Sequence, residues 1–211
     1  MKKATIVTLA LVLVLAASTF ASAANYIGGG IGIIGFKGTD GGATNGTTYE
    51  DALPFALTLA VDFDVMDKLS VSANGYVGIQ KPQGGGQAVS DYKFNYMVGG
   101  YAKYALANLD ALKLGAAVGV NYNNNFAPET LEPVLNYGAG VFAEQPLGET
   151  GTIFGQVMYW AKTAVEDAPI MDHIGGLGGI NFKITDKVAV KGQVEYVNKT
   201  ALFSIGAGYT F

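Results

Sequence analysis

The sequence predicts an all-β protein: a transmembrane, antiparallel, up-and-down β-barrel of ten strands, with eight strands as the alternative. Three observations lead to this prediction. The 211 residues are 50% hydrophobic and only 14% charged, and their mean hydropathy is +0.28. Beyond the first residues, no apolar run approaches the roughly 20 residues that a spanning helix needs. Instead, apolar and polar residues alternate, as in strands with one lipid-facing side and one inward side.

Composition excludes several other classes of protein. A disordered chain would have low hydrophobicity and high charge. The absence of cysteine excludes a disulfide scaffold and any thiolate metal site, and we expect no metal or cofactor. The formal net charge of −4 and the isoelectric point of about 4.9 argue against binding to nucleic acid.

Residues 1–23 have the pattern of a secretory signal peptide. Lys2 and Lys3 precede an apolar stretch over 4–17, and Ala21, Ser22 and Ala23 form a small-x-small cleavage site. A transmembrane anchor is the alternative, but the apolar stretch is short for a bilayer and no lysine follows it to stop transfer. We therefore expect Sec-type export, cleavage near Ala23, and a single barrel domain over 24–211.

The clearest strand is expected over 55–65, where every odd position is large and apolar and every even position is small or polar. A helix would scatter these residues around its circumference, whereas a strand places them on one face. In chain order, the ten expected strands cover 25–36, 55–65, 69–80, 93–103, 112–121, 135–144, 152–160, 173–184, 188–196 and 203–211. The count of ten depends on the weaker segments 152–160 and 173–184.

The strands of the first half differ in how clearly they alternate. The glycine-rich segment 25–36 contains a G-x-G-x-x-G pattern at 30–35, but no helix is expected after it to hold a phosphate, so we interpret the glycines as allowing bending or close packing. The next three strands have apolar faces formed by Leu69, Val71, Ala73, Val77, Ile79, Phe94, Tyr96, Val98, Ala102, Leu112, Leu114, Ala116, Val118 and Val120. Small or polar residues occupy their opposite faces.

The second half repeats this alternation. Leu135, Tyr137, Ala139 and Val141 oppose Asn136, Gly138, Gly140 and Glu144. Val188, Val190, Val194 and Tyr196 oppose Lys191, Gln193 and Glu195. The last strand places Phe203, Ile205, Ala207, Tyr209 and Phe211 opposite Ser204, Gly206, Gly208 and Thr210. A strand of about 11 residues tilted by about 40° matches the thickness of a bilayer core.

The connections between strands favour a membrane barrel over a soluble one. Long loops are expected at 37–53, 81–91, 123–133 and 161–172, and shorter links join the other strand pairs. Short periplasmic turns with longer outer loops are typical of outer-membrane barrels. A soluble barrel or sandwich would expose its polar face to water, but here that face is crowded with glycine, alanine and paired charges, which suit a closed lumen better.

Aromatic residues cluster near the ends of the expected strands, which predicts a membrane aromatic girdle at each interface. Ordinary strand propensity is the alternative explanation. The girdle residues are Phe55, Tyr92, Tyr122, Tyr159, Trp160 and Tyr196 at the outer ends, and Phe63, Tyr104, Tyr209 and Phe211 at the inner ends.

The C-terminal strand resembles the insertion signal of bacterial outer-membrane proteins, an amphipathic strand that ends in Phe with an aromatic residue two positions earlier. The residues that carry the resemblance are Phe203, Ile205, Ala207, Tyr209 and Phe211. Together with the signal peptide, they make the chain similar to small bacterial outer-membrane β-barrel proteins. The resemblance implies recognition by the barrel-assembly machinery and residence in the outer membrane of a Gram-negative envelope, in contact with lipid and lipopolysaccharide.

Seven charged residues are expected on the inward face near the periplasmic end: Asp62, Asp64, Lys103, Lys113, Glu144, Lys183 and Lys191. Charges in a narrow lumen need partners or water. They form either a network that plugs and rigidifies the barrel or a charged constriction that selects small solutes. The many glycines and alanines on the inward face leave room above this layer and favour an open pore.

Other candidate sites have weaker signals. His173 is the only histidine and lies beside Asp172, but no serine is close in sequence, so we expect an interfacial polar residue and no enzyme. The outer loops, including the short link at 198–200, are acidic, with nine carboxylates (Asp40, Glu50, Asp51, Asp91, Glu129, Glu132, Glu166, Asp167 and Asp172) against four lysines (Lys37, Lys81, Lys162 and Lys199). Their spacing matches no calcium loop, which favours a solvated surface.

Two functions follow from these patterns, with a third further removed. The lumen charge and the small inward residues favour a narrow channel for the passive passage of small solutes or ions, which is the first choice. The low strand number and the paired charges favour a closed structural or adhesion-type barrel that displays acidic loops. An outer-membrane hydrolase is the distant third. The sequence does not identify a solute or ligand.

Overall fold

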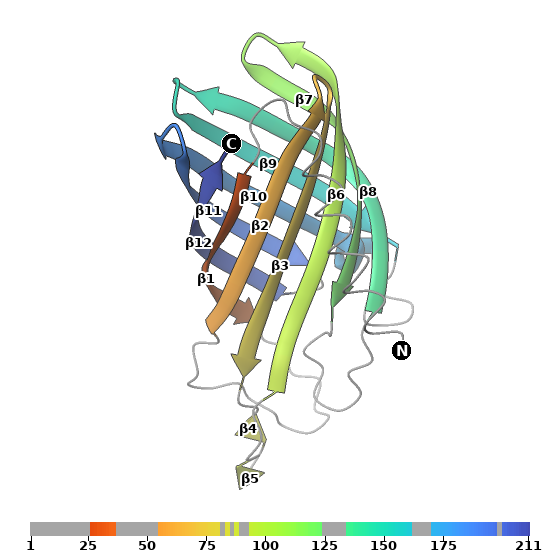
Figure 1. Ribbon diagram of the computed structural model, residues 1–211. Coiled ribbons are helices and arrows are strands. Elements are labelled where there is room, and N and C mark those ends of the chain that lie inside the picture. Colours follow the sequence, from red (N-terminus) through yellow and green to blue (C-terminus); the bar gives the residue numbers. More distant parts are fainter. Residues whose placement is uncertain are drawn as a thin grey trace.

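In the computed structural model, ten long antiparallel strands close into one barrel (Figure 1). The structure describes residues 26–36, 55–80, 83–84, 87–88, 93–123, 134–161, 170–197 and 200–211. The barrel strands are β1 (Tyr26–Phe36), β2 (Phe55–Met66), β3 (Leu69–Gln80), β6 (Lys93–Leu109), β7 (Leu112–Asn123), β8 (Val134–Leu147), β9 (Gly151–Trp160), β10 (Ile174–Thr185), β11 (Val188–Val197) and β12 (Thr200–Thr210). This confirms the prediction of ten strands rather than eight.

Each barrel strand pairs with its neighbour in the chain, and β1 pairs with β12 to close the sheet. The four short turns over 67–68, 110–111, 148–150 and 186–187 lie at one end of the barrel, which we call the turn end (Figure 1). The opposite end of the barrel is called the loop end. The loop end also carries a small hairpin, whose strands β4 (Gln83–Gly84) and β5 (Gln87–Ala88) have two residues each, and the short 3-10 helix η1 (Ile170–His173). Among the described residues, no helix is both long and apolar enough to cross a membrane.

Strand β6 is longer than the alternation predicted, because its pairing with β7 continues to Leu109↔Leu112. An irregularity in the register between Ala105 and Ala107 interrupts the ladder, as a β-bulge does when it bends a strand. Asp110, in the turn that follows, has a φ of 53°. As a result, the β6–β7 hairpin extends beyond the neighbouring turns (Figure 1).

Glycines at the β1–β12 seam bring the first and last strands close together. Gly28 pairs with Gly208, and Gly30 pairs with Gly206. A Cβ at Gly30 would collide with the carbonyl oxygen of Ile205. The glycine pattern of 30–35 therefore serves strand packing, as interpreted from the sequence, because β1 continues through it to Phe36.

The predicted division into two faces is confirmed along the strands. On β2, for example, Leu57 and Leu59 are more than half exposed, whereas Ala56 between its two outward neighbours is buried. The outward face of the barrel is formed by exposed large apolar residues, including Ile31, Val118, Val141, Val157, Phe203 and Ile205. An apolar exterior of this kind is the surface that lipid would cover.

The two faces differ in how they tolerate glycine replacement, and this gives a first prediction. On the inward face of β8, a Cβ at Gly140 would collide with the carbonyl oxygen of Val157. On the neighbouring strand, Gly155 lies between exposed Ile153 and Val157 and has no atom within 4 Å of its Cβ position. We expect Gly140→Ala to lower the free energy of unfolding by about 1–3 kcal/mol through overpacking.

The matched control is Gly155→Ala, which makes the same chemical change on the outward face. It should be neutral or stabilising by about 0.4–1 kcal/mol, because it restricts only the unfolded chain. Urea unfolding of both variants in detergent provides the comparison. Equal losses for the two variants would contradict the assignment of the two faces.

Candidate functional site: the barrel lumen

The inward face carries most of the residues that could perform a function, and they form three zones. An ionic zone lies near the turn end, an apolar zone fills the middle, and a polar zone contains Glu195 and several amides. Because neighbouring strands are staggered, side chains far apart in sequence meet across the lumen. The contacts in each zone determine whether the lumen is open or filled.

Glu144 on β8 connects two lysines in the ionic zone. Its Oε1 atom is 2.5 Å from the ammonium of Lys103 on β6, and its Oε2 atom is 4.0 Å from that of Lys113 on β7. The Lys103 ammonium also lies 5.6 Å from the centre of the Phe142 ring. Two positive charges therefore share one carboxylate within the lumen.

Asp62 and Lys191 form a second ion pair, in which the two atoms are 2.7 Å apart. Asp62 lies on β2 and Lys191 on β11, with β1 and β12 between them, so the pair crosses part of the lumen. The Lys191 ammonium also faces two aromatic rings, with 5.6 Å to the centre of Tyr26 and 5.1 Å to that of Phe154. Such contacts with ring faces are favourable for a cation.

The other two members of the predicted charge set behave differently. Asp64 interacts electrostatically with Lys113, Glu144 and other charges of the ionic zone. Lys183 lies opposite Ala189 on the inward face of β10 but is exposed, and within the described ranges it forms no ion pair. The structure thus brings six of the seven predicted charges together and leaves Lys183 at the rim.

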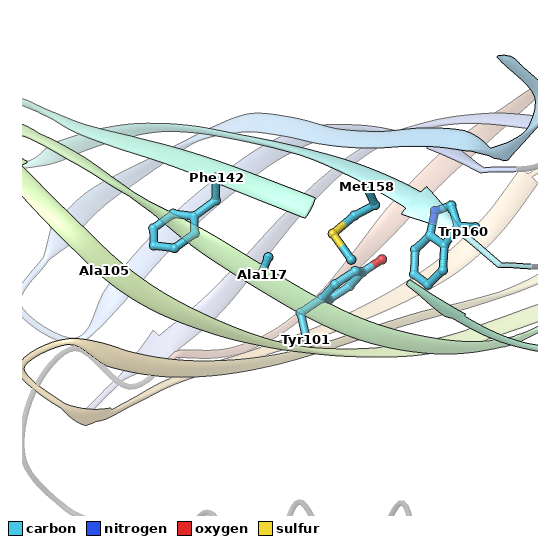
Figure 2. Close-up of a cluster of buried hydrophobic side chains, with 6 residues drawn as sticks. All are labelled: Tyr101, Ala105, Ala117, Phe142, Met158 and Trp160. Carbon is cyan, nitrogen blue, oxygen red and sulfur yellow. The ribbon is translucent and has the colours of Figure 1, made fainter. Parts of the chain in front are cut away.

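Figure 2 shows a buried apolar cluster on the inward face of the adjacent strands β6 to β9: Tyr101, Ala105, Ala117, Phe142, Met158 and Trp160. The rings of Tyr101 and Trp160 meet edge to face, with centres 6.2 Å apart. Between their strands, Gly119 and Gly138 lie in the same row of the sheet. A Cβ at either glycine would come within 2.8 Å of one of these rings, so the rings occupy the space that the glycines leave.

A second buried cluster closes the other side of the lumen and consists of Ala56, Tyr76, Met97 and Leu202. Several glycines of the inward face are therefore covered by large side chains from neighbouring strands, although their small size suggested open space from the sequence. Gly115 gives a further example, because its Cβ would lie 2.5 Å from the Phe142 ring.

The placement of Trp160 in the membrane girdle was wrong. Trp160 is only 1% exposed and belongs to the lumen cluster, whereas Tyr159 beside it is 49% exposed on the outward face. Both residues are aromatic and end the same strand, so the aromatic pattern did not separate them. The alternation of β9 does separate them, because Trp160 shares its parity with buried Met158 and Gln156.

The other described girdle residues lie on the outward face, which is compatible with the predicted interfaces. Phe55, Tyr104, Tyr122, Tyr159, Tyr196, Tyr209 and Phe211 are at least partly exposed there. Phe63 also points outward by the parity of β2 but is buried, with its ring edge to face against that of Phe211. The residues of the proposed insertion signal, Phe203, Ile205, Ala207, Tyr209 and Phe211, are all exposed.

The polar zone centres on Glu195, which sequence reasoning placed inward but did not include among the functional charges. Glu195 on β11 is 3% exposed. Its carboxylate accepts a 3.0 Å hydrogen bond from the Tyr101 hydroxyl on β6 and a 2.7 Å hydrogen bond from Asn74 Nδ2 on β3. Because β11 lies on the opposite side of the barrel from β3 and β6, these contacts span the lumen.

Several buried polar atoms along the strands have no hydrogen-bond partner among the described residues. They are Asn74 Oδ1, Asn121 Nδ2, Asn123 Oδ1, Gln156 Nε2, Trp160 Nε1 and Asn181 Oδ1. Unpaired buried groups are costly, so such atoms usually contact water or a bound species. Their presence marks the polar zone as the part of the lumen where a small ligand could be held.

His173 at the loop end is engaged in structural contacts. Its Nδ1 atom lies 2.8 Å from the carbonyl oxygen of Trp160, and a carbonyl can only accept, so Nδ1 carries the proton. The imidazole also stacks on Tyr159, with ring centres 5.1 Å apart. Within the described part of the chain, no cluster of three or more histidine, aspartate or glutamate side chains is arranged to hold a metal ion.

Some sequence predictions lie outside the described residues. These are the signal peptide over 1–23, the girdle residue Tyr92, and the acidic long loops apart from the residues of η1.

Comparison with solved structures finds similarity to bacterial outer-membrane proteins. The outer membrane protease OmpT from Escherichia coli superposes with a TM-score of 0.55 at 10% identity, covering 91% of this chain and 98% of that one. The outer membrane phospholipase A from Escherichia coli matches with a TM-score of 0.43 at 12% identity, covering 90% and 91%. The attachment invasion locus protein Ail of Yersinia pestis matches with a TM-score of 0.34 at 13% identity, covering 89% and 97%.

The closed sheet defines the fold class: the chain is a ten-stranded antiparallel β-barrel, and the outer membrane protease OmpT from Escherichia coli has a similar fold. No protein-family model matches the sequence, and no curated protein matches it either. At 10% identity, the likeness to OmpT shows the fold alone and does not assign an activity.

Proposed function

We propose that this protein is a closed outer-membrane barrel that acts through the loops it displays at the cell surface and does not pass solutes through its lumen. The observation that carries the proposal is the contact of Glu195 with Tyr101 and Asn74 across the lumen. The ion pair between Asp62 and Lys191 adds a second crossing. A pore that passes solutes needs a continuous water-filled path, and these contacts interrupt it.

The apolar cluster gives further support. Trp160, Met158 and Phe142 are each at most 4% exposed, although all three point into the lumen. The narrow channel was favoured from sequence because glycines and alanines leave space, but that space is taken by these side chains. The channel therefore becomes the second candidate, supported by the charged zone that would face any solute entering from the turn end.

The rest of the proposal concerns how the protein reaches and occupies the membrane. After export and cleavage near Ala23, the exposed apolar face of β12, which ends at Phe211, would be recognised by the barrel-assembly machinery. Lipid and lipopolysaccharide would then surround the outward face. We propose no catalytic role, because the described contacts of His173 are with the Trp160 carbonyl oxygen and the Tyr159 ring, neither of which is a nucleophile.

The test is single-channel recording of the purified protein in a planar bilayer. We expect no step currents from folded protein, whose insertion is verified independently by protease protection. Reproducible salt-dependent steps would contradict the closed barrel and favour the channel. In that case Asp62→Asn and Lys113→Ala should change ion selectivity, whereas in a closed barrel they should change only stability.

A further inference from the structure

The outward face of the barrel carries an open groove toward the loop end. The groove crosses five consecutive strands, β10, β11, β12, β1 and β2 (Figure 1), and has a volume of about 510 Å³. Its walls are formed by six apolar side chains: Ile31, Ile33, Phe55, Val194, Phe203 and Ile205. All six are exposed on the outside of the barrel, so the groove opens outward and not into the lumen.

Two glycines leave the groove open where larger residues would fill it. Gly192 on β11 and Gly178 on β10 both line the groove. A Cβ at Gly192 would meet only the Ile180 side chain, at 3.9 Å. A Cβ at Gly178 would meet only the Phe154 carbonyl oxygen, at 3.7 Å. Both distances are ordinary van der Waals contacts, so no described side chain occupies the Cβ position of either glycine.

The register of the sheet shows how the groove runs. One row of paired outward residues crosses the five strands: Phe55, Ile33, Phe203, Val194 and Gly178. Four steps of about 4.8 Å between strands give this row a length of about 19 Å. The hydrocarbon layer of one bilayer leaflet is about 15 Å thick. Because the strands of membrane barrels tilt by about 40°, a row across them is inclined into the leaflet and can accommodate most of one acyl chain.

We propose that this groove binds one acyl chain of a membrane lipid in preference to the lipids that cover the rest of the outward face. The groove is continuous with the apolar face that lipid would cover, and its walls are entirely hydrocarbon side chains. A chain in the groove is contacted on both sides, whereas a chain on a flat face is contacted on one, and within a bilayer such van der Waals packing provides the gain. A second copy of the barrel fits less well, because its outward face is broad and convex.

The inference rests on the membrane location in the proposed function, but it does not rest on the closed lumen, because the groove faces away from the lumen. Channel currents would therefore contradict the proposed function and leave the groove unaffected. Failure of the folded protein to insert into phospholipid vesicles would overturn the membrane location and the groove together. Insertion without a favoured lipid would overturn the groove alone.

The first test is photolabelling of the wild type in phosphatidylcholine vesicles. A trace of the lipid carries a photoreactive diazirine within one acyl chain, and the labelled peptides are identified after irradiation and proteolysis. We expect the label to be concentrated on β1, β11 and β12, which carry five of the six wall residues. Equal labelling of the outward residues of β6, β7 and β8 would overturn the proposal.

Native mass spectrometry of the delipidated protein in detergent measures the strength of binding. Added phosphatidylcholine should give a first adduct that is favoured over later ones. Gly192→Leu places a side chain in the groove and should weaken the first adduct about tenfold, the effect of losing about two methylene contacts. Gly100→Leu is the matched control on β6, because a Cβ there would meet only the Ser72 carbonyl oxygen, at 3.9 Å. Binding by Gly100→Leu should match that of the wild type.

The same measurement distinguishes the acyl chain from other occupants. Lysophosphatidylcholine, which has one acyl chain, should compete for the first adduct of the wild type, whereas glycerophosphocholine, which has none, should not. Competition by both would assign the site to the headgroup and overturn the proposal. A random distribution of adducts, or equal losses in the two leucine variants, would also overturn it. A dimer that Gly192→Leu dissociates would instead assign the groove to a second copy of this chain.

Discussion

Replacing Trp160 with alanine is expected to lower the free energy of unfolding by about 3–5 kcal/mol, the range for large aromatic residues in well-packed cores. The side chain is 1% exposed and lies against Tyr101, Gly138 and Gly175, so its removal leaves a cavity that its neighbours cannot close. Urea unfolding followed by circular dichroism in detergent measures the loss. Of the substitutions proposed here, Trp160→Ala should also be the one that most readily lets ions pass in a bilayer, because it removes the largest ring from the lumen.

Tyr159→Ala is the natural control because Tyr159 is the adjacent aromatic residue and is half exposed on the outward face. Its loss should be less than half of that for Trp160→Ala. Trp160 is also the only tryptophan of the chain, so its fluorescence reports one position. Brominated lipids should leave that fluorescence unquenched. Strong quenching, or a larger effect of Tyr159→Ala, would contradict the lumen position of Trp160 and support a position in the membrane girdle.

Glu144→Gln should produce the next largest loss, about 2 kcal/mol, between the values typical of exposed and buried ion pairs. The substitution keeps the volume of the side chain but leaves Lys103 and Lys113 facing each other without a shared carboxylate. High salt should recover part of the loss, because the groups are partly exposed and counterions can screen the two lysines. The measurement is the urea midpoint at low and at high ionic strength.

Removing one of the two lysines tests the mechanism of this loss. Lys103→Met in the Glu144→Gln background should restore part of the stability, because it removes the repulsion that the first change created. Glu149→Gln, in the exposed turn between β8 and β9, makes the same chemical change without a lumen partner and should be neutral within about 0.5 kcal/mol. A loss for Glu149→Gln as large as that for Glu144→Gln would exclude the ionic zone as the cause.

Much of the fold could be predicted because it depends on local alternation. In β2, outward residues such as Leu57 and Leu59 alternate with inward residues such as Asp62, and this alternation predicted both the strand and its two faces. The same rule placed Glu144, Lys103 and Lys191 inward. It did not predict the far end of β6, because the bulge between Ala105 and Ala107 breaks the alternation there.

The strand count, the two faces and the fold class could be read from the sequence alone, because they follow from the alternation of side chains along each strand. What fills the lumen became clear only in the folded barrel. Glu195 meets Tyr101 and Asn74 from 94 and 121 positions away, and that meeting depends on barrel closure and on the stagger between strands. Alternation predicts that a side chain points inward, but it does not predict which side chain on the opposite strands that residue contacts. For that reason the small inward residues suggested an open channel, whereas in the folded barrel the rings of Tyr101, Phe142 and Trp160 cover them.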